Sequence, residues 1–341
     1  MFKRIVLLTI VLCLFSSQAF ADSMLPGKGV VIKPARATWS TSFFQSALIK
    51  KGLEELGYDV KKPKDLANAL AYKSIVMGDV DYWPSGWLPN HKSYMGGDFF
   101  EHAAVYGYVV KAGGLQGYLV SKKIAEELNI TSLDDFKRPE VIAAFDKTGD
   151  GKADLTACPP GWACERDIDR HLKIYDLKKY VKPIKAAYEA SMAANLGAHQ
   201  AGEPVFFYTW TPNWTVFKLQ PGKDVVWINV PKIIPSKDEL DVVDSMTVEN
   251  LSGAISSPLK MGWAASDIRV VANIKFAEKN PAAKRFFEVF TLPLVDINEQ
   301  NSLMNAGEKS PKDVERHVNA WIEKNKEKWD AWLAEARKAA E

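Results

Sequence analysis

The sequence predicts an α/β protein with two lobes and a hinge between them. In the first hundred residues, strand-like and helix-like segments alternate in the order β-α-β-α-β, which favours a parallel sheet with helices on its faces. The 341 residues exceed what one core usually organises. A glycine-rich break at residues 112–114 separates two strand-like segments, as is typical of a hinge.

The early elements follow from apolar runs and glycine stops. Residues 30–32 form an apolar strand, and Ser40-Thr41 can cap a helix that ends before Gly57. The next helix ends at Gly78. We expect strands at 30–32, 58–60 and 79–83 and helices at 43–56 and 67–77.

The later elements include two continuous apolar strands of the buried type, at 205–210 and 225–230. The last helix, at 313–339, carries an apolar stripe that includes Trp321, Trp329 and Trp332, which we expect to pack in the core. The other expected elements are strands at 106–110, 117–120 and 268–272 and helices starting at 122, 132, 165, 274 and 282.

The first 21 residues predict a cleaved signal peptide and therefore an exported protein. Lys3 and Arg4 precede an apolar run at 5–15 that is too short to span a membrane, and a small-residue cleavage site ends at Ala21. Cys13 lacks the small residues that a lipoprotein signal places before its cysteine. Cleavage leaves 42 basic residues against 42 acidic ones, a balance that disfavours nucleic acid or an anionic membrane as the main partner.

Two cysteines remain after cleavage, in the segment "CPPGWACE". An exported pair such as Cys158 and Cys164 most plausibly forms a disulfide. The spacing is Cys-x5-Cys rather than the Cys-x2-Cys of thiol oxidoreductases, and no metal-binding cluster lies nearby. A role in disulfide exchange also lacks neighbours that lower a thiol pKa, apart from a helix N-terminus. The bond is therefore expected to rigidify the loop that carries Trp162.

Three tryptophans are candidate ligand-binding residues. Trp87, Trp162 and Trp210 each lie beside Pro or Gly in turn-like sequence, where an α/β sheet presents loops to its cleft. Aromatic faces attract a cation, and a quaternary ammonium has no N–H with which a hydrogen bond might hold it. A primary ammonium would prefer a carboxylate, and residues 84–92, 158–164 and 206–214 around these tryptophans contain none. The three rings together predict a cage for a quaternary ammonium.

The same segments supply groups for an anion. His91 follows Trp87 by four residues, and the backbone N–H groups of Ala163 and Cys164 open a helix expected to begin near Glu165. Helix N-termini bind anions through their free N–H groups and the helix dipole. The disulfide loop is thus expected to preorganise both halves of a zwitterion site.

At this point the chain resembles the periplasmic glycine-betaine and proline-betaine binding proteins of osmoprotectant ABC importers. The resemblance covers nearly the whole mature chain, in the segments "LPGKGV", "LEELGYDVKKP", "DKTGDGKADLTACPPGWACE", "PVFFYTWTPNW", "PGKDVVW" and "AEKNPAAKRFFEVFTLPLVDINEQN". It implies a type II periplasmic-binding-protein fold, each lobe a mainly parallel sheet flanked by helices. It also implies no enzymatic activity and no cofactor. The implied division is residues 22–115 and 264–341 for lobe I and 116–263 for lobe II.

The resemblance implies roles for particular residues. Trp87, Trp162 and Trp210 stand where the family has its three-tryptophan box, and Cys158 and Cys164 match its disulfide pair. His91 and the backbone amides of Ala163 and Cys164 match the groups that hold the carboxylate.

Two departures from the family leave the exact ligand open. Ala163 stands where the family carries glycine, and the residues around Trp87 and His91 differ. Choline, a larger betaine or dimethylsulfoniopropionate therefore remain alternatives to glycine betaine and proline betaine. The implied setting is a periplasmic monomer that docks on the membrane permease and ATPase subunits of an ABC importer.

Three rival interpretations have weaker support. The segment "DKTGDGKAD" imitates part of a calcium loop, but the twelfth position, where an EF-hand needs Glu, is Ala157. A sugar site would surround its aromatic rings with more Asp, Asn and Arg than these segments hold. A hydrolase would need a Gly-x-Ser-x-Gly elbow or histidines at metal-ligand spacing, and the sequence has neither.

Overall fold

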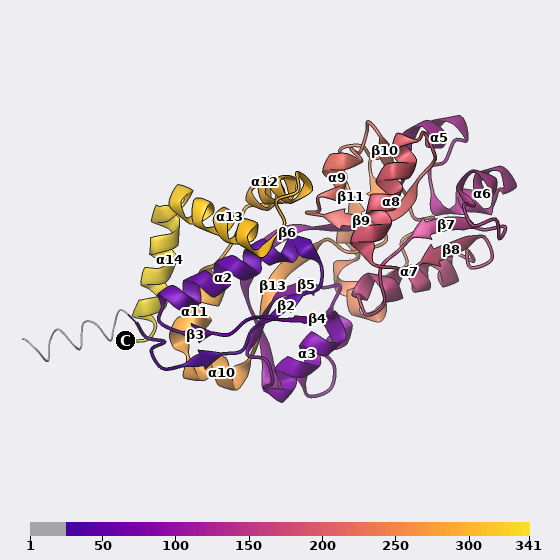
Figure 1. The fold of residues 1–341 in the computed structure, drawn as a ribbon. Coiled ribbons are helices and arrows are strands. Elements are labelled where there is room, and N and C mark those ends of the chain that lie inside the picture. The colour runs from indigo at the N-terminus through magenta and orange to yellow at the C-terminus, as the bar shows by residue number, and fades with distance from the viewer. Residues whose placement is uncertain (1–24) are drawn as a thin grey trace, which may run out of the picture.

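The computed structural model describes residues 25–341, so the predicted signal peptide lies outside the described residues. The α/β fold class is confirmed, and the elements gather in two lobes (Figure 1). The first lobe contains β1–β5, β13, α2, α3, α10, α11, α13 and α14. The second lobe contains β7–β10 and α5–α9. Strand β6 runs through both lobes.

One mixed sheet extends across the molecule. Its strands lie in the order β5 (Tyr82–Leu88), β13 (Ser266–Asn273), β6 (Ala103–Ser121), β9 (Phe206–Thr211), β7 (Ala153–Thr156) and β8 (Val181–Ile184), and β10 (Val225–Ile228) also pairs with β6. The pairs that involve β6 or β13 are antiparallel, and those of β7 with β8 and β9 are parallel, so the expectation of a mainly parallel sheet in each lobe is wrong for this sheet. Smaller parallel pairs join β1 (Val31–Ile32) to β3 (Asp59–Val60) and β2 (Ala35–Ala37) to β4 (Lys64–Leu66), and an antiparallel pair joins β11 (Thr247–Val248) to β12 (Leu259–Lys260).

Helices cover the sheet on both sides. The α-helices are α2 (Phe43–Glu55), α3 (Asn68–Met77), α4 (Phe99–His102), α5 (Lys122–Glu127), α6 (Pro139–Phe145), α7 (Ala163–Ile174), α8 (Tyr188–Gln200), α9 (Thr215–Lys218), α10 (Ile274–Lys279), α11 (Pro281–Val289), α12 (Leu294–Asn305), α13 (Pro311–Lys324) and α14 (Lys326–Lys338). Short 3-10 helices are η1 (Ser40–Ser42), η2 (Lys92–Tyr94), η3 (Leu133–Lys137) and η4 (Lys237–Met246). No α-helix within residues 25–341 combines the length and apolarity that a membrane span requires.

The expected helix ends have clear physical causes. Helix α3 ends at Gly78, whose φ of +76° lies in the left-handed region that glycine adopts without strain. Helix α13 starts with a capping box, in which the Ser310 hydroxyl accepts from the Asp313 backbone N–H while the Asp313 carboxylate accepts from the Ser310 N–H.

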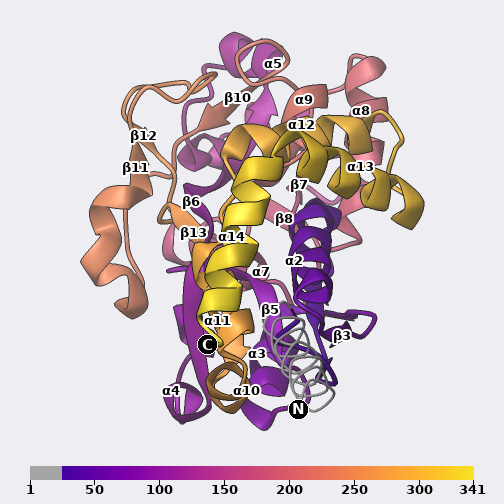
Figure 2. The same ribbon diagram turned by 90° about the vertical axis from the view of Figure 1, so that its left-hand side faces the viewer.

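The expected last helix is two helices. The chain breaks at Asn325, with φ −115° and ψ 29°, and α14 then turns back over α11, as Figure 2 shows. The core prediction for Trp321, Trp329 and Trp332 is confirmed, because all three are buried and their rings pack against one another. The apolar period continues through the break, which explains why the sequence pattern suggested one element.

Two further differences bear on the candidate site. Strand β5 extends to Leu88, so Trp87 lies inside a strand and not in the turn after it. The glycine-rich residues 112–114 lie inside the single strand β6, where its pairing with β13 shifts register between Val110 and Gly114 and its pairing with β9 begins at Leu115. There the Ala112 N–H donates to the Asp267 carboxylate at 2.7 Å, which holds Ala112 at its positive φ of 49°.

Candidate ligand-binding site

A small cavity lies between the two lobes. All six residues that the sequence predicted for the site line it: Trp87, His91, Trp162, Ala163, Cys164 and Trp210. Five lining residues were not predicted: Trp39, Asn68, Asn90, Gln116 and Tyr208. The eleven lining residues include no Asp, Glu, Lys or Arg, so the wall offers aromatic faces and neutral polar groups.

Tryptophans from separate elements form the aromatic part of the wall. The rings of Trp162 and Trp210 meet edge to face, with centroids 5.6 Å apart. Trp87 comes from β5 and lies against β6 at Gly114, where an added Cβ would come within 2.7 Å of its ring. Glycine at this position therefore lets the indole lie close to the sheet.

Trp39 is a fourth aromatic wall that sequence reasoning missed. It is buried, it precedes η1, and its ring centroid lies 5.3 Å from that of Trp162 in an edge-to-face arrangement. A signal was available, because Trp39 lies two residues after the end of β2, at the carboxyl end of a strand of a parallel pair.

The disulfide loop is held as expected. Cys158 and Cys164 are bonded, with Cα atoms 6.0 Å apart. Gly161, at φ +88°, makes the turn before Trp162, and its N–H donates to the Glu165 carboxylate at 2.9 Å. Lys185 donates to the same carboxylate at 3.0 Å and thereby ties the loop to β8's end of the sheet.

Helix α7 begins at Ala163, two residues earlier than expected, with Trp162 as its N-cap residue. Both Ala163 and Cys164 are buried, and among residues 25–341 their backbone N–H groups have no hydrogen-bond acceptor. The first N–H groups of a helix carry its positive dipole end. This end of the cavity is therefore suited to an anionic group.

His91 is neutral and fully engaged in the wall. Its Nδ1 accepts from the Trp87 backbone N–H at 3.1 Å, and its Nε2 lies 2.8 Å from the side-chain amide of Asn68. Burial, with the nearby Arg166 guanidinium, lowers the pKa of His91 to about 3. The imidazole is thus a hydrogen-bonding group near neutral pH rather than a cation.

A second amide lines the cavity without having been predicted. The Tyr208 hydroxyl donates to Gln116 Oε1 at 2.7 Å and so fixes which face of that amide turns to the cavity. Gln116 lies in β6, and Tyr208 pairs with that strand from β9. Both residues sit in ordinary apolar strand sequence, which gave no signal for the site.

Direct contacts hold the lobes together over the cavity. The Trp162 indole N–H donates to the Thr38 hydroxyl at 2.9 Å, and Asn90 donates to the Asp167 carboxylate at 2.8 Å. Lys92 and Asp241 form an exposed ion pair at 2.9 Å. These contacts join residues of the first lobe to residues between positions 162 and 241, so the structure is that of a closed form.

Asp167 is the least exposed ionisable side chain among these closing contacts. Its carboxylate also accepts from the Trp263 indole N–H at 3.2 Å. Burial raises the pKa of Asp167 to about 6, although Arg166 and these two donors act in the opposite direction.

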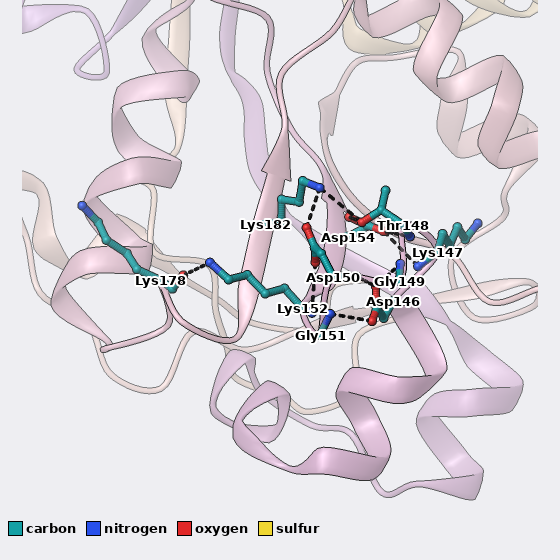
Figure 3. Close-up of polar contacts among 10 residues, drawn as sticks. All are labelled: Asp146, Lys147, Thr148, Gly149, Asp150, Gly151, Lys152, Asp154, Lys178 and Lys182. Carbon is teal, nitrogen blue, oxygen red and sulfur yellow. Dashed lines mark hydrogen bonds and ion pairs between the residues drawn. The ribbon is translucent and has the colours of Figure 1, made fainter.

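The aspartate-rich loop at residues 146–154 is organised by hydrogen bonds to its own backbone and by a lysine (Figure 3). The Asp146 carboxylate accepts from the backbone N–H groups of Gly149, Asp150 and Gly151. The Lys182 ammonium donates to the Asp150 carboxylate at 2.6 Å and places a positive charge beside it. Within residues 25–341, no cluster of three or more His, Cys, Asp or Glu side chains is arranged to hold a metal ion. The loop is an Asp/Gly turn closed by a lysine.

The sequence comparisons point in one direction. A family model described as the substrate binding domain of ABC-type glycine betaine transport system matches residues 30–324. The chain is 41% identical over 330 residues to the glycine betaine-binding periplasmic protein OusX of Dickeya dadantii (strain 3937), with 95% of each chain covered. It is 39% identical to a glycine betaine/proline betaine-binding periplasmic protein of Salmonella typhimurium, again with 95% of each chain covered.

Solved structures share the fold at lower identity. The lactococcal OpuAC in its closed-liganded conformation, complexed with glycine betaine, superposes with a TM-score of 0.66 at 19% identity, covering 89% of this chain and 99% of that one. An ABC-transporter choline binding protein in complex with choline gives 0.66 at 18% identity, covering 91% and 96%.

Proposed function

The chain belongs to the family of substrate-binding domains of ABC-type glycine betaine transport systems, and from this premise we propose that its cavity binds glycine betaine or proline betaine for import. The family is one of transport receptors and not of enzymes. The single observation that carries the proposal is the cavity wall itself, which combines four tryptophans with the open N-terminus of a helix.

The aromatic wall suits the cationic end of such a ligand. Trp39, Trp87, Trp162 and Trp210 would surround the methylated nitrogen, each contact contributing about 0.5–2 kcal/mol in a desolvated site. The absence of a carboxylate among the cavity-lining residues favours a quaternary ammonium over a primary one, which would leave its N–H donors unpaired.

The polar wall suits the carboxylate. The N–H groups of Ala163 and Cys164 would donate to its oxygens, aided by the dipole of α7. His91 belongs to the same wall and takes part in holding this end of the ligand. The disulfide between Cys158 and Cys164 would keep these donors and the Trp162 ring in one arrangement before the ligand arrives.

We place lobe I at residues 22–115 and 264–341 and lobe II at 116–263. Ligand would enter between open lobes, and closure would form the Thr38–Trp162 and Asn90–Asp167 contacts over it. The closed monomer would then dock on the membrane permease and ATPase subunits of an importer. Its curated relatives are periplasmic proteins, and we propose the same compartment for this chain, reached through cleavage after Ala21.

Isothermal titration calorimetry with glycine betaine, proline betaine, choline, dimethylsulfoniopropionate, proline and maltose tests the proposal. Micromolar or tighter binding of a betaine, with no heat from maltose, is the expected result. Preference for choline or dimethylsulfoniopropionate would move the assignment to a related quaternary or sulfonium solute. Binding of maltose without any betaine response would overturn it in favour of a sugar receptor.

A further inference from the structure

We propose that Asn68 is a specificity-determining residue of the cavity, and that its side-chain NH2 donates to the anionic end of the ligand. The proposal rests on the proposed betaine-binding function. It adds Asn68 to the residues that would contact the ligand and states that Asn68 donates the hydrogen bond. Asn68 is the first residue of α3, and its exposed fraction is 2%. It lines the cavity and lies beside His91.

The Asn68 amide is satisfied at one end only. In the structure Asn68 Nδ2 lies 2.8 Å from His91 Nε2, and Asn68 Oδ1 is buried without a hydrogen-bond partner in the described part of the chain. A buried polar group without a partner costs about 1–3 kcal/mol. Such a group in a cavity wall is what a polar ligand atom can satisfy.

The hydrogen-bond network of His91 decides which amide atom is the free one. The Trp87 backbone N–H donates to His91 Nδ1, so this nitrogen carries no proton. The Tyr72 hydroxyl, 3.2 Å from the same Nδ1, is placed to donate to it as well. The imidazole is neutral, because burial lowers its pKa to about 3, and its single proton therefore lies on Nε2.

A protonated Nε2 requires an acceptor from Asn68. The amide oxygen must therefore face His91, because an amide NH2 facing Nε2–H would place two donors against each other. We therefore turn the amide over, which leaves its shape unchanged, so that the NH2 group takes the unpartnered position that the structure gives to Oδ1. In this arrangement His91, which lines the cavity itself, is also a positioning residue for Asn68, because it fixes the orientation of that amide.

The location of Asn68 directs this donor to the same end of the cavity as the α7 N-terminus. Ala67, its neighbour, packs against the disulfide loop, since a Cβ added at Gly161 would lie 3.3 Å from the Ala67 Cβ. The starts of α3 and α7 thus meet at one wall. A carboxylate there would accept from donors of both lobes, so that recognising the anion and closing the lobes become one event.

The test compares Asn68→Asp and Asn68→Ala with wild type, using glycine betaine and choline as probes in calorimetry. Asp keeps the acceptor for His91 and is favourable in the first turn of a helix, but it turns a negative oxygen toward the ligand carboxylate. Loss of one charge-assisted hydrogen bond corresponds to a dissociation constant raised about 10- to 150-fold. We expect at least this loss for glycine betaine with Asn68→Asp, a similar loss with Asn68→Ala, and a change within about threefold for choline.

A double-mutant cycle with His91→Ala tests the positioning role. If His91 orients Asn68, the loss of affinity for glycine betaine in the double variant should be smaller than the sum of the losses in the two single variants. Fully additive losses would overturn that role. Equal losses for both probes, or an unchanged preference in Asn68→Asp with native circular dichroism, would overturn the assignment of Asn68. A wild-type protein that binds neither probe would instead overturn the proposed function, and this inference with it.

Discussion

Replacement of Ala163 by proline offers a direct test of the helix N-terminus as the carboxylate site, because it deletes one backbone donor and keeps the helix. Ala163 is the first residue of α7, the position where proline is most readily accepted in a helix. The residue before it, Trp162, has φ −85° and ψ 151°, the extended conformation that a following proline requires. The Ala163 N–H has no acceptor within residues 25–341, so its removal breaks no bond of the protein itself.

The expected effect follows from the chemistry of the lost donor. A hydrogen bond from a backbone N–H to a charged group contributes about 1.5–3 kcal/mol, which raises the dissociation constant for glycine betaine about 10- to 150-fold. The proline Cδ also occupies the place of the hydrogen and pushes a carboxylate oxygen away. Choline has no carboxylate, so its affinity should change much less.

The assay is calorimetric titration of both ligands, with Ala163→Gly as the matched control. Glycine retains the N–H and should leave the ratio of the two affinities unchanged. The melting temperature of Ala163→Pro should stay close to that of wild type. If Ala163→Pro bound glycine betaine as tightly as wild type does, the carboxylate would not be held at the start of α7, and the reasoning would be refuted.

Three further changes test other parts of the structure. Trp162→Ala should weaken betaine binding by about 1–3 kcal/mol, because it removes an aromatic face from the cavity. The control Trp227→Phe changes a core residue away from the cavity wall and should leave the dissociation constant unchanged. Equal affinities for Trp162→Ala and wild type would refute the cage. Burial raises the pKa of Asp167 to about 6, so the folded protein binds the carboxyl proton more tightly than the unfolded chain does. The contribution of Asp167 to the free energy of unfolding therefore falls as pH rises from about 4 to 6. Asp167→Asn should therefore gain stability relative to wild type over that range, by at most about 3 kcal/mol, as urea denaturation would measure; a difference independent of pH would contradict the assignment. Since the Lys182 ammonium already pairs with Asp150, millimolar Ca²⁺ should leave the melting temperature unchanged, and a rise of several degrees would show that the loop takes up the ion.

The sequence predicted those parts of the fold that local chemistry determines. Apolar runs and glycine stops placed α2 and α3 within a residue or two, because a helix that meets a residue at positive φ has to end there. The break at Asn325 carried no such signal, since the apolar stripe continues across it. Its position depends on the packing of α14 against α11, which involves residues far apart in the sequence.

The site residues that the sequence predicted are those with distinctive neighbours in the sequence. Trp162 stands between two cysteines, and Trp210 stands beside proline in turn-like sequence. Asn68 had no such context: an amide at a helix start usually serves as a cap, and its partner His91 lies 23 residues away. Only the fold brings the two together, and only the hydrogen bonds of His91 determine what the amide can offer.

The wall of the cavity is built without a single formal charge, and this has a consequence for binding in concentrated electrolyte. Attraction between exposed ions fades over about 8 Å at physiological salt and over shorter distances as salt rises. The aromatic rings and amide groups of the wall would be in direct contact with the ligand, so mobile ions would not lie between them and screen the interaction. The dissociation constant for a zwitterionic ligand should therefore change little with ionic strength.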